Sequence, residues 1–291
     1  MKHGIVNNIG KAMVAAMSIS LSAAVAWGGD SAKAAKLNNE GVALVQKGDI
    51  KAAIGKFKDA IDADVHHVEA AHNLGKLLIA AKQYALAEKI LQYVTRENPD
   101  DMGSFVQLAQ TAALLGKDDA VDSAVERIAN GDKTLLPSLA LLLSGQGSQS
   151  AAERTAQKAV EVDPGNAEAW YDKGIVAQRS KKLAEAEAAY RKSVEIESTN
   201  AKAWVNLGNV IDAQGRSDDA IAAYEKAYAA NAESPLALYN LGRMLVLKSR
   251  DPKRGLELLQ AATRHGDDPG AKAARELLLH LVAQTKKGGA K

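Results

Sequence analysis

Small residues recur along most of this chain at a spacing of about 34 positions. The column reads Gly41, Gly75, Ala109, Ala140, Gly174, Gly208 and Gly242. A fixed period of this length is typical of an array of helical hairpins, in which each hairpin buries its apolar face only against its neighbours. We therefore expect a binding surface, and not a reaction centre, to carry the function.

Three further columns keep the same period. A large column reads Leu37, Ala71, Phe105, Leu136, Trp170, Trp204 and Leu238; a second small column reads Ala53, Ala87, Ala120, Ala152, Ala186, Ala220 and Gly255; and a bulky column reads Phe57, Leu91, Ala124, Ala156, Tyr190, Tyr224 and Leu259. Small residues let two helix backbones approach closely, and bulky residues fill the spaces between helices. The columns therefore predict tight helix packing, in which Gly208→Leu is a structural lesion.

The clearest repeat, residues 201–234, resembles the tetratricopeptide repeat (TPR), whose columns are an aromatic residue or Leu, a Leu, a Gly, an Ala, an aromatic residue and an Ala. The matching residues are Trp204, Leu207, Gly208, Ala220, Tyr224 and Ala227. The resemblance implies an all-α fold, a right-handed α-solenoid of about seven helix-turn-helix repeats with a C-terminal capping helix. It also implies that the first helix of each repeat lines a concave groove.

The period divides the chain into seven expected repeats: 34–67, 68–101, 102–132, 133–166, 167–200, 201–234 and 235–268. We expect a linker at 27–33, a capping helix at 269–285 and a flexible basic tail at 286–291. The repeats between 102 and 166 are irregular, with one shortened turn and a Ser/Gly-rich turn at 144–150. Two interpretations of that turn stay open, a functional hinge and ordinary sequence drift.

Residues 1–26 differ in composition from the rest of the chain. Lys2 and Lys11 precede an apolar run that ends in Ala24-Val25-Ala26, a pattern typical of a secretory signal peptide cleaved after Ala26. We therefore expect a periplasmic or secreted protein without stable membrane insertion after cleavage. The alternative is an uncleaved N-terminal membrane anchor. The sequence contains no Cys, so no lipoprotein attachment residue is present.

Charge and motif patterns exclude several function classes. Loss of the two signal lysines leaves basic residues balanced against the 35 acidic ones, so we expect no general attraction to nucleic acid or anionic lipid. His66, His67 and His72 lie close together in sequence but lack a complete ligand set for a metal. No spacing indicates a nucleophile with its base. We predict no enzymatic activity, no cofactor and no metal site.

A polar column lies two residues before the small column: Asn39, Asn73, Gln107, Ser138, Asp172, Asn206 and Asn240. An Asn side chain offers both donors and an acceptor, so it can pair with the backbone of an extended peptide. The column is similar to the asparagine ladder of the O-linked N-acetylglucosamine transferases. That resemblance implies peptide capture by Asn39, Asn73, Asn206 and Asn240, and more weakly by Gln107 and Asp172. The alternative is that these amides bond neighbouring helices.

The C-terminal repeats carry the richest set of expected groove residues. These are Tyr171, Asp172, Gln178, Arg179, Asn206, Asn209, Asp212, Tyr239, Asn240 and Arg243. Aromatic and Arg side chains among adaptable polar groups are typical of interaction hot spots. The cations of the carboxylate clamp found in TPR cochaperones are absent, so we expect no capture of a C-terminal carboxylate.

We therefore expect a protein or peptide partner, bound by a scaffold of the cell envelope. Two alternatives stay open. One is a structural protein that self-associates into homo-oligomers, and the other is an accessory subunit of an envelope enzyme or of a secretion or polysaccharide-export complex.

Overall fold

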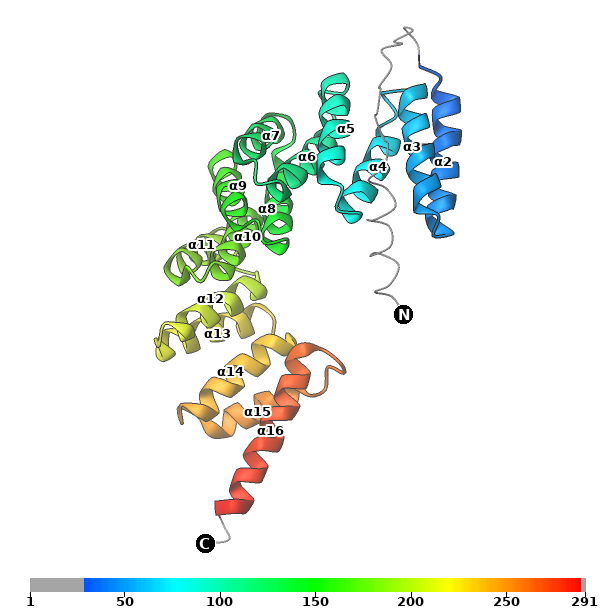
Figure 1. Ribbon diagram of the computed structural model, residues 1–291. Helices are drawn as coiled ribbons and strands as arrows, with labels where there is room; N and C mark the ends of the chain where they lie inside the picture. The colour runs from blue at the N-terminus through cyan, green and yellow to red at the C-terminus, as the bar shows by residue number, and fades with distance from the viewer. Residues whose placement is uncertain (1–28, 289–291) are drawn as a thin grey trace. The chain divides into compact units, whose positions relative to one another are not determined.

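The computed structural model describes the backbone of residues 29–288, and within that range the chain is helical and has no β-strand (Figure 1). The expected signal peptide at 1–26 lies outside the described residues, as do the last residues of the expected tail. The all-α prediction is confirmed. None of the helices in residues 29–288 is both long and apolar enough to span a membrane.

Successive helices form seven hairpins, followed by one longer helix. The hairpins are α2 (Ser31–Gln46) with α3 (Ile50–Ala63), α4 (Val68–Ala80) with α5 (Tyr84–Glu97), α6 (Met102–Leu114) with α7 (Asp118–Gly131), α8 (Leu136–Gly145) with α9 (Gln149–Val162), α10 (Ala167–Arg179) with α11 (Leu183–Ile196), α12 (Ala201–Ala213) with α13 (Ser217–Ala230), and α14 (Pro235–Leu247) with α15 (Pro252–Ala262). The last helix is α16 (Pro269–Gly288), and a 3₁₀ turn, η1 (Lys133–Leu135), precedes α8.

The first helix begins earlier than the sequence suggested. We expected a linker through residue 33, but α2 starts at Ser31. Asp30 explains the earlier start, because its side chain accepts a hydrogen bond from the Lys33 backbone N–H at 2.9 Å and caps the helix. The Asp30 N–H also donates to the carbonyl of Ala63, which ties this end to α3.

The turn inside every hairpin contains one residue with positive φ. In sequence order these residues are Gly48, Lys82, Gly116, Gly147, Lys181, Gly215 and Ser249. The left-handed conformation suits glycine because glycine has no Cβ, whereas Lys and Ser adopt it at a cost. The period seen in the sequence is therefore repeated in the backbone. The Ser/Gly-rich turn follows this rule through Gly147, and a hydrogen bond from Ser144 Oγ to Gln149 Oε1 at 3.2 Å spans it.

The chain divides into two compact units, Met1–Lys158 and Ala159–Lys291, with the boundary inside α9. In each unit, first helices of adjacent hairpins contact one another, as α4 does with α6 and α12 with α14. Second helices of adjacent hairpins are joined by side-chain ion pairs, such as Arg154 on α9 with Asp122 on α7 and Arg254 on α15 with Glu225 on α13, while their backbones stay farther apart. The first helices therefore form the inner row within each unit, and we call the surface that they share the first-helix face.

The two small columns and the bulky column pack inside each hairpin. A Cβ added at Gly208 would lie 2.5 Å from the Tyr224 ring, and one at Gly174 would lie equally close to the Tyr190 ring. Both tyrosines are fully buried in one apolar cluster of the C-terminal unit. The glycines therefore provide the space that the rings occupy.

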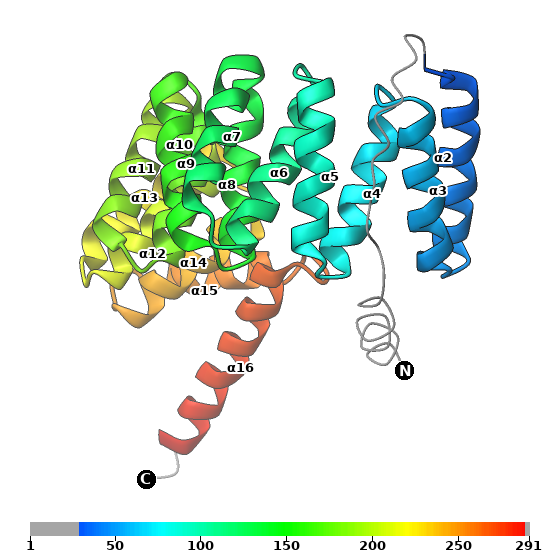
Figure 2. The ribbon, with the colours of Figure 1, turned by 45° about the horizontal axis from the view of Figure 1, so that its top comes forward.

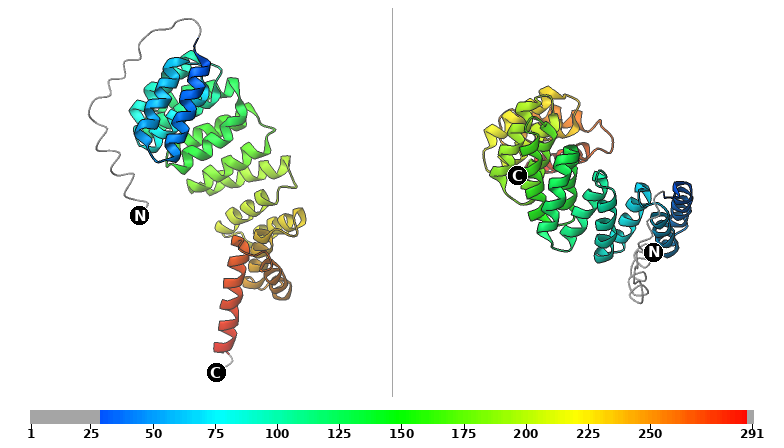
Figure 3. Two further views of the ribbon diagram at one scale, coloured as in Figure 1. Left: turned by 90° about the vertical axis from the view of Figure 1, so that its right-hand side faces the viewer. Right: turned by 90° about the horizontal axis from the view of Figure 1, so that it is seen from above.

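The last helix covers the end of the C-terminal unit. Ala271 and Ala274 are buried against α14 and α15, while Leu277, Leu278 and Leu281 are partly buried. The C-terminal half of α16 projects beyond those helices (Figure 2, Figure 3).

Candidate functional site

The expected groove residues lie on the first-helix faces of both units. Asn39, Asn73 and Gln107 lie on α2, α4 and α6 of the N-terminal unit. The C-terminal unit holds Tyr171, Asp172 and Arg179 on α10, Asn206 and Asn209 on α12, and Tyr239, Asn240 and Arg243 on α14. The set of C-terminal residues singled out in the sequence therefore belongs to one compact unit.

In the N-terminal unit the amides contact neighbouring repeats. Asn73 Nδ2 donates to Asn38 Oδ1 at 3.0 Å, and Asn38 is buried, whereas Asn39 is exposed and takes no part in this bond. Gln107 is also buried, and its Oε1 has no hydrogen-bond partner among the described residues. The structure brings Asn73 together with the residue beside Asn39, and it leaves Gln107 with an unused acceptor.

In the C-terminal unit a chain of contacts links three helices. Asn206 Nδ2 on α12 donates to the Tyr171 hydroxyl on α10 at 3.1 Å. The Tyr171 ring lies 5.8 Å, between centroids, from the Tyr190 ring, which comes from α11. The Tyr190 hydroxyl in turn donates to Gln178 Oε1 at 2.9 Å. These bonds hold the side chains in fixed positions before any ligand arrives.

A second set of contacts orders the next repeat. The Tyr224 hydroxyl donates to Asn209 Oδ1 at 2.8 Å, and Arg243 forms an ion pair with Asp212 at 3.1 Å. Asn240 Nδ2 donates to the Leu236 carbonyl of its own helix at 2.9 Å. Asn240 uses one N–H in this bond and keeps a second, whereas the Asn206 amide also acts on the Tyr190 hydroxyl through a hydrogen bond that opposes the rise in the pKa of that phenol.

Tyr190 and Tyr224, which the sequence interpretation assigned only to packing, also bond polar residues of the first-helix face. Their rings pass beside Gly174 and Gly208, which lets their hydroxyls reach the polar residues of the first-helix face. Burial raises the pKa of both phenols, that of Tyr224 to about 12, so both hydroxyls remain donors at neutral pH. The available signal was a Tyr in the bulky column where the other repeats have Phe, Leu or Ala.

Asp172 stands apart from the other polar residues of this face. It is 6% exposed, yet its carboxylate makes no hydrogen bond or ion pair within the described residues. Burial raises the pKa of this carboxyl group to about 6; the negative charge of Glu168 raises it further, and the positive charge of Arg179 opposes the shift. Asp172 is therefore a largely ionised, buried group without a direct partner at neutral pH.

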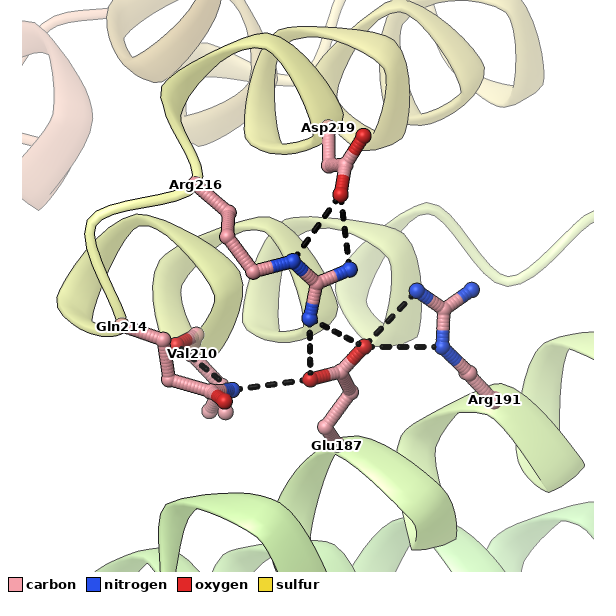
Figure 4. Close-up of polar contacts among 6 residues, drawn as sticks. All are labelled: Glu187, Arg191, Val210, Gln214, Arg216 and Asp219. Atoms are coloured by element: carbon pink, nitrogen blue, oxygen red, sulfur yellow. Dashed lines mark hydrogen bonds and ion pairs between the residues drawn. The ribbon is translucent and has the colours of Figure 1, made fainter.

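A carboxylate network joins the fifth and sixth hairpins outside this face (Figure 4). Glu187 on α11 accepts hydrogen bonds from Arg191 on its own helix, from Gln214 at 2.8 Å and from Arg216 at 2.9 Å. Arg216 also pairs with Asp219 at 2.7 Å. Glu187 is mostly buried, whereas both arginines are about half exposed. The network fixes the α12–α13 turn against α11.

We expect Glu187→Gln to lower the free energy of unfolding by about 1 kcal/mol, a modest value because solvent screens the exposed arginines. The bonds to its donors lower the pKa of Glu187 below its ordinary value of 4.5. Its contribution is therefore fully present above pH 4.5 and is lost as pH falls through the lowered folded-state pKa. Urea denaturation at low and high salt measures the difference in the free energy of unfolding between the wild type and Glu187→Gln. Glu185→Gln, on the same helix but more exposed, is the control, and an equal loss there would contradict the assignment.

The three clustered histidines have other contacts. His66 Nδ1 lies 2.7 Å from Asn98 Oδ1, His67 caps α4, and His72 Nε2 lies 3.1 Å from Asp101 Oδ2. No group of three side chains able to hold a metal ion comes together in the part of the chain that the structure describes. His66 and His72 therefore contact the next repeat, and His67 caps its own helix.

Comparisons with known proteins agree with this architecture. Models of the tetratricopeptide repeat match residues 44–124, 138–201 and 189–222. One similar solved structure is a human IFIT1 dimer with PPP-AAAA, at 16% identity and a TM-score of 0.51, and the match covers 87% of this chain and 65% of that one. Another is MamA, at 22% identity and a TM-score of 0.44, and the match covers 54% of this chain and 93% of that one. A third is YrrB, described as a TPR protein with an unusual peptide-binding site, at 15% identity and a TM-score of 0.42, and the match covers 76% of this chain and 97% of that one.

A comparison with curated proteins found no match. The family models together cover more than half of the sequence, and the hairpins repeat with the period and columns of that family. The chain therefore belongs to the tetratricopeptide repeat family.

Proposed function

We propose that this protein is a non-enzymatic scaffold of the cell envelope, and that it binds an extended segment of a partner protein along the first-helix face of α10, α12 and α14. The observation that carries the proposal is the row of side chains already ordered on this face. Asn206 is held by Tyr171, and Arg243 is held by Asp212. Binding loses little side-chain entropy when the contacting groups are fixed in advance.

The spacing of the helices suits an extended peptide. Packed helices lie about 8–10 Å apart, and an extended chain advances about 3.3 Å per residue. The amides of Asn206 and Asn240, on successive first helices, would therefore meet the peptide backbone about three residues apart, with Asp172 at the corresponding position on α10. Because backbone groups are common to all sequences, such contacts supply affinity, and the Tyr and Arg side chains around them supply selectivity.

The envelope location rests on the signal-like pattern of residues 1–26 and on the balanced charge of the remaining chain. In that location the scaffold serves as an adaptor, either between proteins or as an accessory subunit of an enzyme, secretion or polysaccharide-export complex.

One observation favours self-association as a second candidate function. Leu279 on α16 is 71% exposed, so the projecting helix offers apolar surface to another molecule. Sedimentation over a concentration series tests this candidate, because self-association requires the mass to grow without a partner. A constant monomer mass would remove it.

We expect Asn206→Ala combined with Asn240→Ala to weaken partner binding roughly thirtyfold, because two main-chain contacts of about 1 kcal/mol each are lost. Crosslinking in the native envelope followed by mass spectrometry identifies the bound segment, and titration with that segment measures its affinity. Helicity is expected to stay unchanged, and the melting temperature to fall only slightly, because the bonds to Tyr171 and to the Leu236 carbonyl are lost.

Asn130→Ala is the matched control for this experiment. Asn130 donates to the Glu126 carbonyl of its own helix at 2.9 Å, the same local bond that Asn240 makes, but it lies on a second helix, α7. If the double variant binds as tightly as the wild type, the first-helix face is not the binding surface.

A further inference from the structure

We infer that the first-helix face of the C-terminal unit selects a partner segment carrying a lysine or arginine, and that Asp172 receives this cation. The inference rests on the proposed binding of a peptide segment to this face. It adds the chemistry of the partner and names the residue that determines it.

Asp172 differs from the other carboxylates of the protein that lie in comparable surroundings. Glu88, equally buried in the N-terminal unit, bonds Lys117 at 2.6 Å. Asp212, on the same face as Asp172, pairs with Arg243. Asp172 alone among these three has no cation within ion-pair distance in the described chain. A buried carboxylate is normally paired, because an unpaired one loses its hydration without compensation.

The carboxylate remains accessible to a ligand. Among the described residues, several polar atoms are both fully enclosed and without a hydrogen-bond partner, and the Asp172 oxygens do not belong to that group. Because these oxygens have no hydrogen-bond partner among those residues, they must keep some contact with solvent. With a pKa of about 6, the group carries its negative charge at neutral pH. An ammonium or guanidinium group arriving from outside would make the charge-assisted hydrogen bonds that the protein itself does not provide.

The surroundings favour an organic cation. Tyr171 is the neighbour of Asp172 in the chain and is only partly buried; burial and, secondarily, the charge of Asp172 raise the pKa of its phenol. Tyrosine faces attract ammonium and guanidinium groups. Glu168, one helical turn before Asp172, adds negative potential. Arg179 acts on Asp172 only from beyond ion-pair distance, so it does not occupy the position of the incoming cation.

The test is a selection of random linear peptides of about twelve residues, long enough to cross three first helices. They are selected at about pH 7.5, where Asp172 is ionised, on the wild-type protein, on Asp172→Asn and on Glu168→Gln. We expect the wild type and Glu168→Gln to enrich peptides with Lys or Arg at a fixed register, and Asp172→Asn to lose that enrichment.

One selected peptide is then synthesised with the basic residue and with glutamine in its place. We expect the glutamine peptide to bind the wild type at least tenfold more weakly than the basic peptide does, because one charge-assisted contact is lost. The two peptides are expected to bind Asp172→Asn with nearly equal affinity. An N-acetylated copy separates a side-chain cation from a terminal amine, and equal affinity after acetylation supports the side chain. Loss of binding on acetylation alone would overturn the assignment to lysine or arginine.

The outcomes separate the two proposals. In one outcome the selected peptides bind the wild type and fail to bind the Asn206→Ala, Asn240→Ala variant, but show no basic residue at a fixed register. This outcome would overturn the role of Asp172 and leave the binding face intact. Failure of the folded wild type to select any peptide would reject peptide binding and the inference together. Equal basic enrichment by Asp172→Asn, shown to be folded by its melting curve, would assign the cation to another residue.

Discussion

Replacement of Gly208 by alanine is expected to destabilise the protein by about 1–3 kcal/mol, although alanine is intrinsically the better helix former. The added Cβ would lie 2.5–2.9 Å from three carbons of the Tyr224 ring. That ring is fully buried and its hydroxyl is bonded to Asn209, so it cannot move without breaking other contacts. Urea denaturation followed by circular dichroism measures the loss.

Gly55→Ala is the matched control. Gly55 is also inside a helix, α3, but a Cβ there meets no atom within 4 Å. We expect this variant to be more stable than the wild type by about 0.5–1 kcal/mol, because only the helix preference of alanine acts. Changes of opposite sign in the free energy of unfolding at Gly208 and Gly55 would distinguish the effect of close packing from that of helix propensity.

A second substitution tests whether the Tyr224 ring is what the added Cβ at position 208 meets. Tyr224→Leu removes the ring atoms that meet the new Cβ, and the equivalent pair Gly75 and Leu91 leaves a wider separation of 3.3 Å. Gly208→Ala should therefore cost less in the Tyr224→Leu background than in the wild type. Equal costs in both backgrounds would contradict the packing of Gly208 on Tyr224.

The repeat architecture was predictable because each column occurs seven times, so an irregular residue in one repeat does not hide the pattern. Local exceptions were harder to predict. The early start of α2 depends on one capping residue, Asp30, and η1 forms where Asp132 bonds the backbone and hydroxyl of Thr134. Such short-range polar contacts compete with the period and leave little trace in it.

The candidate site was predictable as a set of positions but not as a set of contacts. Helical spacing placed Asn206 and Tyr171 on first helices, but their mutual hydrogen bond depends on the rotation of one hairpin against the next. In the first repeat the inner amide is Asn38 and not Asn39, because a shift of one residue turns a side chain by about 100° around a helix. The isolation of Asp172 depends on which cations lie nearby in three dimensions.

Asp172→Asn is expected to make the unliganded protein more stable than the wild type by about 1–3 kcal/mol near pH 7.5, because it removes a buried charge that lacks a direct partner. The folded-state pKa of about 6 lies above the ordinary value of 3.8. The folded protein therefore binds this proton more tightly than the unfolded chain does. The destabilisation by the charge is fully present above the folded pKa and disappears as pH falls toward 3.8.

The difference in stability between variant and wild type should consequently shrink as pH falls from about 7 to about 4.5, a range in which Glu187 keeps its own contribution. Urea denaturation across that range measures this stability difference. Glu168→Gln is the control: it removes an exposed charge on the same helix that raises the pKa of Asp172 less than burial does, so we expect only a small change. A wild type as stable as Asp172→Asn at neutral pH would mean that the carboxylate is already compensated. A gain in stability together with a loss of basic-peptide preference would instead show that the wild type keeps an unfavourable charge because its ligand neutralises it.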